Sequence, residues 1–286
     1  NHRRLRQLLK RSDFIYVADC KLATLQNLRR IAGCGGLFVS VMPRTWKDDA
    51  LFRQAVRQGQ VQWAHLLSRK NNRQPDARTD HYFLAQGAYA AQGYRLLWIR
   101  STQKAEQDAQ SRAQALAEAL EALKNLQRRL NTYRLKSRQA IEQAITKILK
   151  EHQAQDWIDY QVHTEQAYQK HYGQRGRPSA SRQARLSWKP HFSVVISVKE
   201  QSIELQSRTD GVFPIITNLK PQDYSAKKVL EIYKFQPFLE KRHSQLKTWQ
   251  EVTPVLLKKA ERVIAYLHMH VMALMVGTLI ERQLRQ

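Results

Sequence analysis

Four residues near the end of the chain carry side chains that could act together on a phosphate-containing ligand. They are spaced as Tyr233-x2-Gln236-x3-Glu240-x6-Lys247. Because an α-helix has about 3.6 residues per turn, Tyr233, Glu240 and Lys247 lie along one face of a helix, with Gln236 beside them. A carboxylate can bind a divalent cation, an ammonium group can neutralise a phosphate, and an aromatic ring can stack on a base. The spacing alone also fits an amphipathic helix with scattered polar residues.

The charge of the chain indicates a polyanionic partner. Among 286 residues, 48 are Lys or Arg and 24 are Asp or Glu, which gives a formal net charge of +24. These basic residues are spread along the chain, so we expect a broad binding surface rather than a localisation signal. Nucleic acid is the usual partner of such a surface, and an anionic membrane is the competing one. The charge does not separate DNA from RNA.

Length and cysteine content limit the class of protein. A chain of 286 residues is long enough for one large domain or two modest ones with a sizeable core. The sequence contains two cysteines, Cys20 and Cys34, which provide neither a disulfide framework nor the ligand set of a structural zinc site. A reducing cytosol fits this composition, and the first residues do not form a secretory signal. The start at Asn1, in a basic amphipathic stretch, leads us to expect a fragment or a reading frame cut at its front.

Two apolar runs joined by a helical segment predict a strand–helix–strand unit at the start of the chain. Residues 14–18 are apolar and are followed by Asp19, and residues 22–32 have helical character. After a cluster of glycines, residues 37–42 form a second apolar run that Pro43 closes. This order favours an α/β core in which Asp19 follows a buried strand.

The middle of the chain is expected to be mainly helical, apart from a strand at residues 94–99. Residues 102–172 contain neither Gly nor Pro, and apolar positions recur there with helical spacing, which predicts a helical hairpin. The stretch that follows, Gly173 to Arg182, is a basic loop rich in Gly, Pro and Ser. It fits either a phosphate contact or a solvated linker.

The last third of the chain combines short strands with helices. The predicted strands are residues 192–198, 202–206 and 212–216. Residues 225–246 are a predicted helix that is interrupted near Pro237. This helix would carry the motif that begins at Tyr233.

A final helix is expected from about residue 254 to the end. Residues 263–280 carry no formal charge, and a bilayer needs roughly 17–25 such residues. The stretch also contains His268 and His270, so we expect a buried helix rather than a membrane span. On a helix these two histidines point in different directions and are poor joint metal ligands.

These segments, in this order, resemble the DDE transposases of bacterial insertion sequences, in the class (insertion-sequence-four type) marked by the signature Y-x2-R-x3-E-x6-K. Tyr233, Glu240 and Lys247 match the signature in identity and spacing, whereas Gln236 replaces its arginine. That replacement removes the guanidinium group that the signature would place there.

Two further segments carry the resemblance. Residues 210–218, with the sequence DGVFPIITN, resemble the DG-x-F-x-x-x-TN strand of the family. Residues 14–22, in which Asp19 follows an apolar run, resemble the strand that bears the second catalytic aspartate. The resemblance therefore extends over most of the chain.

The resemblance implies a fold: an α/β, ribonuclease-H-like (retroviral-integrase-like) core, N-terminally truncated, with a largely helical insertion. The first part of the core would be residues 1–43, the mostly helical insertion residues 44–189, and the second part of the core, with C-terminal helices, residues 190–286. Asp210 could add negative charge near the metal ions, but a turn-forming Asp210-Gly211 pair is the simpler interpretation.

The resemblance also implies the roles of the motif residues. Asp19 and Glu240 would be catalytic residues that bind Mg²⁺, in a two-metal site of the kind whose ions lie roughly 3.5–4 Å apart. Lys247 would bind a phosphate, and Tyr233 and Gln236 would contact the DNA end. No residue before Asp19 is a credible first aspartate, so the metal site would be incomplete. We predict that the chain alone does not cleave or transfer DNA.

The expected function is therefore DNA transposition by an insertion-sequence transposase or its C-terminal part. Its partner would be double-stranded DNA at transposon ends and target, bound by a homodimer in the bacterial cytoplasm at the nucleoid, without a membrane. An alternative is a catalytically inactive DNA-binding remnant or inhibitor of transposition. A third possibility is an RNA-binding or membrane-surface protein with a coincidental likeness.

Overall fold

The computed structural model describes residues 2–70, 79–132, 134–171, 185–235 and 256–284, together with residues 242, 244, 245 and 248. The chain forms two compact units. Unit 1 comprises residues 1–50, 84–98 and 213–286, and unit 2 comprises residues 51–83 and 99–212. The three-part division with boundaries near residues 43 and 190 stays a prediction.

The predicted strand–helix–strand unit forms the start of unit 1. It follows helix α1 (His2–Leu9) and consists of β1 (Ile15–Ala18), α2 (Leu25–Gly33) and β2 (Leu37–Val41). Strands β1 and β2 pair in parallel, with Val17 opposite Val39, so α2 makes the crossover between them. The apolar side chains of Leu28 and Ile31 on α2 are buried, as is Phe38 on β2. The sequence pattern of alternating apolar strand and amphipathic helix therefore produces the expected unit.

A mixed sheet accounts for most of the other strands. Its order is β1-β2-β9-β6-β4-β3, and β5 pairs with β6. The remaining strands are β3 (Trp63–Lys70), β4 (Thr79–Ala85), β5 (Tyr89–Ala91), β6 (Tyr94–Ser101) and β9 (Val212–Thr217). Strand β9 is buried along its whole length and runs antiparallel to β2. Parallel and antiparallel pairing together with helices confirm the expected α/β class.

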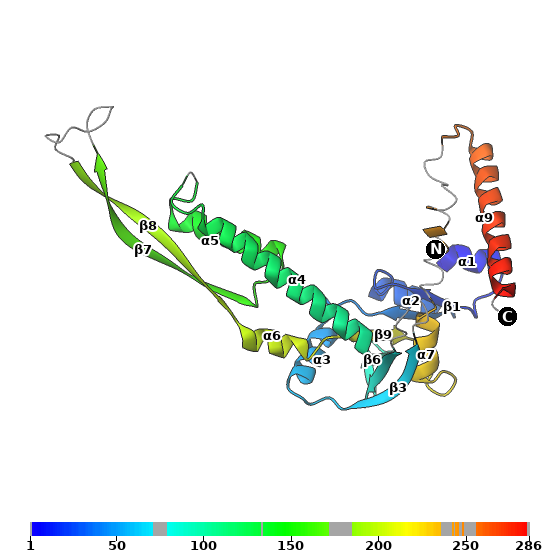
Figure 1. Cartoon of the computed structure of the whole chain (residues 1–286). Helices are drawn as coiled ribbons and strands as arrows, with labels where there is room; N and C mark the ends of the chain where they lie inside the picture. Colours follow the sequence, from blue (N-terminus) through cyan, green and yellow to red (C-terminus); the bar gives the residue numbers. More distant parts are fainter. Residues whose placement is uncertain are drawn as a thin grey trace. The chain divides into compact units, whose positions relative to one another are not determined.

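Unit 2 contains the predicted helical hairpin and, packed on it, a long two-stranded ribbon (Figure 1). The hairpin is made of α4 (Thr102–Gln127) and α5 (Arg138–Glu151), and the ribbon of β7 (Ile158–His171) and β8 (Arg185–Val198). Helix α6 (Glu200–Ser207) follows the ribbon, and α3 (Lys47–Arg57) precedes β3. Leu123, Ile141 and Ile145 are fully buried between the helices and the ribbon.

Two predictions of secondary structure are wrong. Residues 158–171 form strand β7 and not a continuation of the helical region, and residues 202–206 lie in helix α6 and not in a strand. The absence of Gly and Pro from residues 102–172 suggested a helix throughout this stretch. In residues 158–171, however, cross-strand pairing with β8 decides the conformation. The region expected to be mostly helical therefore also contains β3 to β7.

The last helix, α9 (Ala260–Gln283), is exposed rather than buried. None of its side chains is buried, and Met269, Met275 and Leu279 are 60–61% exposed. By length and composition it is the one helix in the described part of the chain that could cross a membrane. The apolar character of α9 matches the sequence prediction, whereas its expected burial is not observed. Ion pairing of Arg242 with Glu281 ties the C-terminal end of α9 to residue 242, at 3.0 Å.

Candidate functional site

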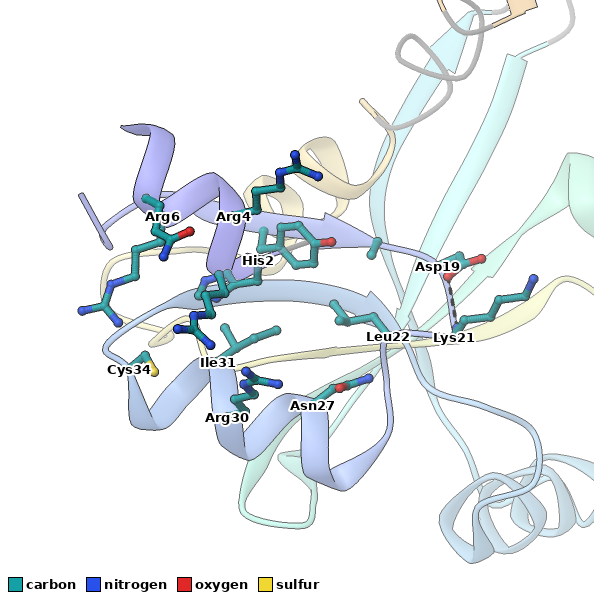
Figure 2. Close-up of a pocket in the computed structure, with 14 residues that line it drawn as sticks. His2, Arg4, Arg6, Asp19, Lys21, Leu22, Asn27, Arg30, Ile31 and Cys34 are labelled. Atoms are coloured by element: carbon teal, nitrogen blue, oxygen red, sulfur yellow. Dashed lines mark hydrogen bonds between the residues drawn. The ribbon is translucent and has the colours of Figure 1, made fainter. Parts of the chain in front are cut away.

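A cavity of about 990 Å³ in unit 1 opens beside the predicted catalytic aspartate (Figure 2). Residues of α1, β1, α2 and the turn between β1 and α2 line it. Asp19 is the one acidic residue of this lining. Its basic residues are Arg3, Arg4, Arg6, Lys21 and Arg30. A cavity with this excess of positive charge is suited to an anionic ligand, and we refer to it as the arginine pocket.

Asp19 lies at the carboxyl end of β1, where sites in α/β sheets commonly form. Its backbone carbonyl accepts a hydrogen bond from Oγ of Ser40, a fully buried residue of β2, at 2.8 Å. One oxygen of its carboxylate, Oδ1, accepts a hydrogen bond from the backbone N–H of Lys21 at 3.1 Å. The main chain at Asp19 is therefore held by the sheet, while its side chain is exposed at the edge of the pocket. The contact to Lys21 is also the hydrogen bond of a turn-forming aspartate.

Helix α2 forms another wall of the arginine pocket. Local sequence signals set the two ends of this helix. The hydroxyl of Thr24 accepts a hydrogen bond from the N–H of Asn27 and caps the first turn. Gly35, with φ of +72°, follows its last turn, in a conformation that favours glycine. With Leu28 facing the core, Arg30 comes to lie on the pocket side. In Figure 2, Asp19 and Lys21 mark one end of the lining, and Arg6 the other.

The electrostatics of the pocket also affect His2 of α1. Burial lowers the pKa of the His2 imidazole below its ordinary value of 6.5, and the positive charges of Arg6 and Arg30 add to this effect. The ring lies against Phe14 and Tyr16, with centroids 5.3 and 5.5 Å apart. His2 is therefore neutral at pH 7 and acts as an aromatic contact between α1 and β1.

The Thr-Asn pair at the end of β9 fastens this strand to β2. Oγ1 of Thr217 donates to the backbone carbonyl of Phe38 at 2.6 Å. The side-chain amide of Asn218 donates to the carbonyl of Gly36 at 2.8 Å and accepts from the N–H of Phe38 at 2.9 Å. These bonds hold the start of β2, and hence the strand pair that presents Asp19. Sequence patterns did not reveal this role, because it depends on segments about 180 residues apart.

Asp210 has a structural role in unit 2. Both of its carboxylate oxygens accept hydrogen bonds from the guanidinium group of Arg112 on α4, each at 2.7 Å, and both side chains are 10% exposed. Gly211 has a φ of +76°, and a Cβ there would lie 2.3 Å from the carbonyl oxygen of Ser101. Asp210-Gly211 is thus a turn, and the buried ion pair with Arg112 anchors it. This agrees with the sequence interpretation of Asp210-Gly211 as a turn-forming pair.

The structure places one of the four motif residues. Tyr233 is the last residue of α7 (Ala226–Tyr233), and its ring lies 6.4 Å from that of Phe213. Helix α7 packs against β1 and β2, so the motif begins on a helix that contacts the strand preceding Asp19. Gln236, Glu240 and Lys247 lie outside the described residues.

The described residues do not make a complete metal site. No group of three His, Cys, Asp or Glu side chains among them is placed to hold a metal ion. Asp19 is the single carboxylate of the arginine pocket. A pair of Mg²⁺ ions needs several carboxylates, and Glu240, the other predicted ligand, is outside the described part of the chain.

Comparisons with protein-family models, with curated proteins and with solved structures find no match to this chain. Sequence reasoning identified Asp19 but missed the arginines around it. The signal was present in the basic amphipathic stretch of residues 2–11, whose packing beside β1 was not predicted.

Proposed function

We propose that this chain is the DNA-binding part of an insertion-sequence transposase, in which Asp19 is one ligand of a metal centre that cleaves and transfers DNA strands. One observation carries the proposal: Asp19 follows a parallel strand and opens onto a pocket lined by five basic residues. A carboxylate for a metal ion and basic groups for phosphates are the components that phosphodiester chemistry needs. The fold proposed with this function is a ribonuclease-H-like core.

The arginine pocket would hold the sugar-phosphate backbone next to Asp19. Guanidinium groups bind phosphate oxygens in pairs, which fixes the direction of the backbone as well as its position. Arg4 and Arg30 come from different elements, α1 and α2, so together they would contact a phosphate from two sides. Tyr233, on the helix that packs against β1, would contact the DNA end, with Gln236 and Lys247 in the same motif.

Mg²⁺ is the proposed cofactor, with Asp19 and Glu240 as its ligands. When bound, it would polarise a phosphoryl oxygen and increase the acidity of the attacking water or hydroxyl group. The described residues supply one carboxylate, which favours a second candidate function, a DNA-binding protein without catalytic activity or an inhibitor of transposition. The two candidates differ in whether Glu240 matters for any reaction.

Binding of a duplex DNA of about 30 base pairs, measured by fluorescence anisotropy, tests the proposal. The double variant Arg4→Gln, Arg30→Gln should bind at least about tenfold more weakly, because two phosphate contacts are lost. A matched control, Arg138→Gln with Lys147→Gln, removes the same charge from exposed positions of α5 and should bind within about twofold of wild type. Equal losses in both variants would show that binding depends on total charge and not on the pocket.

Cleavage of transposon-end DNA with Mg²⁺ or Mn²⁺ separates the two candidate functions. We predict no cleavage by this chain alone. Activity that disappears in Glu240→Ala would contradict that prediction and favour a complete catalytic centre. The proposal further includes a homodimer on two DNA ends, in the bacterial cytoplasm and without a membrane.

A further inference from the structure

The ribbon of β7 and β8 has one apolar and one polar face along most of its length. Its register pairs Ile158 with Val198 and continues to His171 and Arg185. Because side chains of a strand alternate between faces, every second pair shares a face. The pairs Val162–Val194 and Tyr168–Trp188 are therefore on the same face. On the other face, polar pairs such as His163–Ser193 and Glu165–His191 alternate with them.

The apolar face is covered at one end of the ribbon and bare at the other. Near the helices, Val162, Phe192 and Val194 are 6–8% exposed and belong to the core formed with α4 and α5. Farther out on the same face, Tyr168 is 62% exposed and Trp188 is 54% exposed. Figure 1 shows the ribbon continuing beyond the helical hairpin. The outer part of this face has the composition of a contact surface without an intramolecular partner in the described structure.

Tyr168 and Trp188 form a single aromatic platform. Their ring centroids are 3.6 Å apart and the rings are inclined by 38°. Cross-strand aromatic pairs of this kind stabilise a ribbon, and that local role is the simpler explanation of the pair. It does not account for Leu186, one pair farther out on the same face, which is 56% exposed.

The charge around the platform favours one class of partner. From residue 166 to residue 191 the sequence contains no Asp or Glu. The described strands carry Lys170, Arg185 and Lys189 in this stretch. Exposed aromatic rings in a region of uniformly positive charge are typical of nucleic-acid contacts, because the rings contact bases or sugars while the basic groups neutralise phosphates. A two-stranded antiparallel ribbon also fits the major groove of B-form DNA.

We propose that the outer half of the β7–β8 ribbon is a second DNA-contacting surface, with Tyr168 and Trp188 as its contact residues. The partner is double-stranded DNA, and the inference rests on the proposed DNA-binding function. The surface belongs to unit 2 and is separate in sequence from the arginine pocket of unit 1.

The double variant Tyr168→Ser, Trp188→Ser tests the surface. We expect duplex DNA to bind at least about tenfold more weakly, since aromatic contacts of this kind are worth ~1–3 kcal/mol each. The matched control is Val195→Ser, which removes an apolar side chain of similar exposure, 55%, from the polar face of the same strand. It should bind within about twofold of wild type. Tyr168→Phe with Trp188→Phe should retain most of the affinity, because the rings remain.

Several results would overturn the inference, and each differs from failure of the proposed function. Wild-type affinity in the double serine variant, together with weak binding by Arg4→Gln, Arg30→Gln, would exclude the ribbon and leave the arginine pocket intact. A loss of binding to RNA only, or of self-association only, would assign the surface to another partner. Thermal unfolding must be unchanged in the tested variants. If the double serine variant unfolds earlier, the single variants Tyr168→Ser and Trp188→Ser that unfold like wild type should each still bind duplex DNA more weakly, and wild-type affinity in both would overturn the inference. Absence of any duplex binding by the wild-type chain would instead reject the proposed function.

Discussion

At the scale of single residues, Asp19 has two interactions that can be separated by mutation. Its Oδ1 accepts the hydrogen bond from Lys21 that shapes the turn after β1, and its negative charge lies at one end of the arginine pocket. An asparagine retains the turn-forming oxygen and removes the charge. The substitution therefore distinguishes a residue needed for the turn from one needed for metal binding.

Asp19→Asn should leave the free energy of unfolding within about 0.5 kcal/mol of wild type, as for surface substitutions that keep local hydrogen bonds. In contrast, any stimulation of DNA-end binding by Ca²⁺ or Mg²⁺ should be lost, because the carboxylate is removed. Chemical unfolding and metal titration of the DNA complex measure the two effects. Asp13→Asn, at an exposed ion pair with Arg11, is the control and should respond to the metal like wild type. An unchanged metal response in Asp19→Asn would remove the residue from the proposed centre.

The lowered pKa of His2 predicts a pH dependence for the packing of α1. The neutral imidazole is favoured in the folded state, so the contact is strongest above pH 6.5 and weakens as the pH falls from 6.5 toward the lower folded pKa. Hydrogen exchange of the α1 amides, corrected for intrinsic rates, should therefore be faster at pH 5 than at pH 7.5. In His2→Phe, which keeps the ring contacts with Phe14 and Tyr16, this difference should be absent. An NMR titration that gives His2 a pKa above 6.5 would contradict the prediction.

At the scale of elements, polar side chains connect segments that lie far apart in the sequence. In unit 1, Asn218 joins β9 to Gly36 and Phe38 at the start of β2. In unit 2, Arg112 of α4 is paired with Asp210, next to the turn that begins β9. These contacts explain why the DG and TN dipeptides flank the same strand. Both are structural contacts, in agreement with the interpretation of Asp210-Gly211 as a turn-forming pair.

Asp210→Asn should destabilise unit 2 by about 3 kcal/mol, because it leaves the Arg112 guanidinium without its charge partner in a site from which water is largely excluded. Arg112→Met should have a similar effect for the reciprocal reason. The double variant should be clearly less destabilised than the sum of the two, and urea unfolding of all four proteins measures this coupling. Strictly additive losses would show that the pair contributes little.

At the scale of the whole molecule, a net charge of +24 on 286 residues would make the proposed association with DNA dependent on salt. The arginine pocket and the ribbon belong to different units, so their contributions are counted separately. The exposed apolar helix α9 introduces a second possible partner, a lipid bilayer, because it has the length and composition of a membrane span. Salt dependence distinguishes the two kinds of partner, since apolar insertion is not weakened by salt.

Between about 50 and 200 mM salt, duplex DNA affinity should fall roughly a hundredfold, which corresponds to about four phosphate contacts. Any binding to anionic vesicles should be reversed by the same salt, and zwitterionic vesicles should not bind. Anisotropy and vesicle flotation provide the measurements. Salt-resistant flotation with zwitterionic lipid would instead assign α9 to a membrane and contradict the expectation of a membrane-free protein.

The sequence could predict those features that depend on neighbouring residues. Apolar runs and a capped amphipathic helix specified β1, α2 and β2, and the helical spacing specified α4 and α5. The position of Asp19 directly after a strand could be predicted for the same reason. The α/β class then followed from the order of these segments.

Other features depended on contacts between distant residues. The β7 segment lacks Gly and Pro and was predicted to be helical, whereas its pairing with β8 makes it a strand. The arginines around Asp19 come from α1 and α2, and only the packing of both helices beside β1 brings them together. The apolar sequence of α9 predicted a helix but not its exposure, because burial depends on what packs against it. Local patterns thus determined the elements and the charge of this protein, while tertiary packing decided which side chains share a pocket, because that requires long-range contacts that no local pattern encodes.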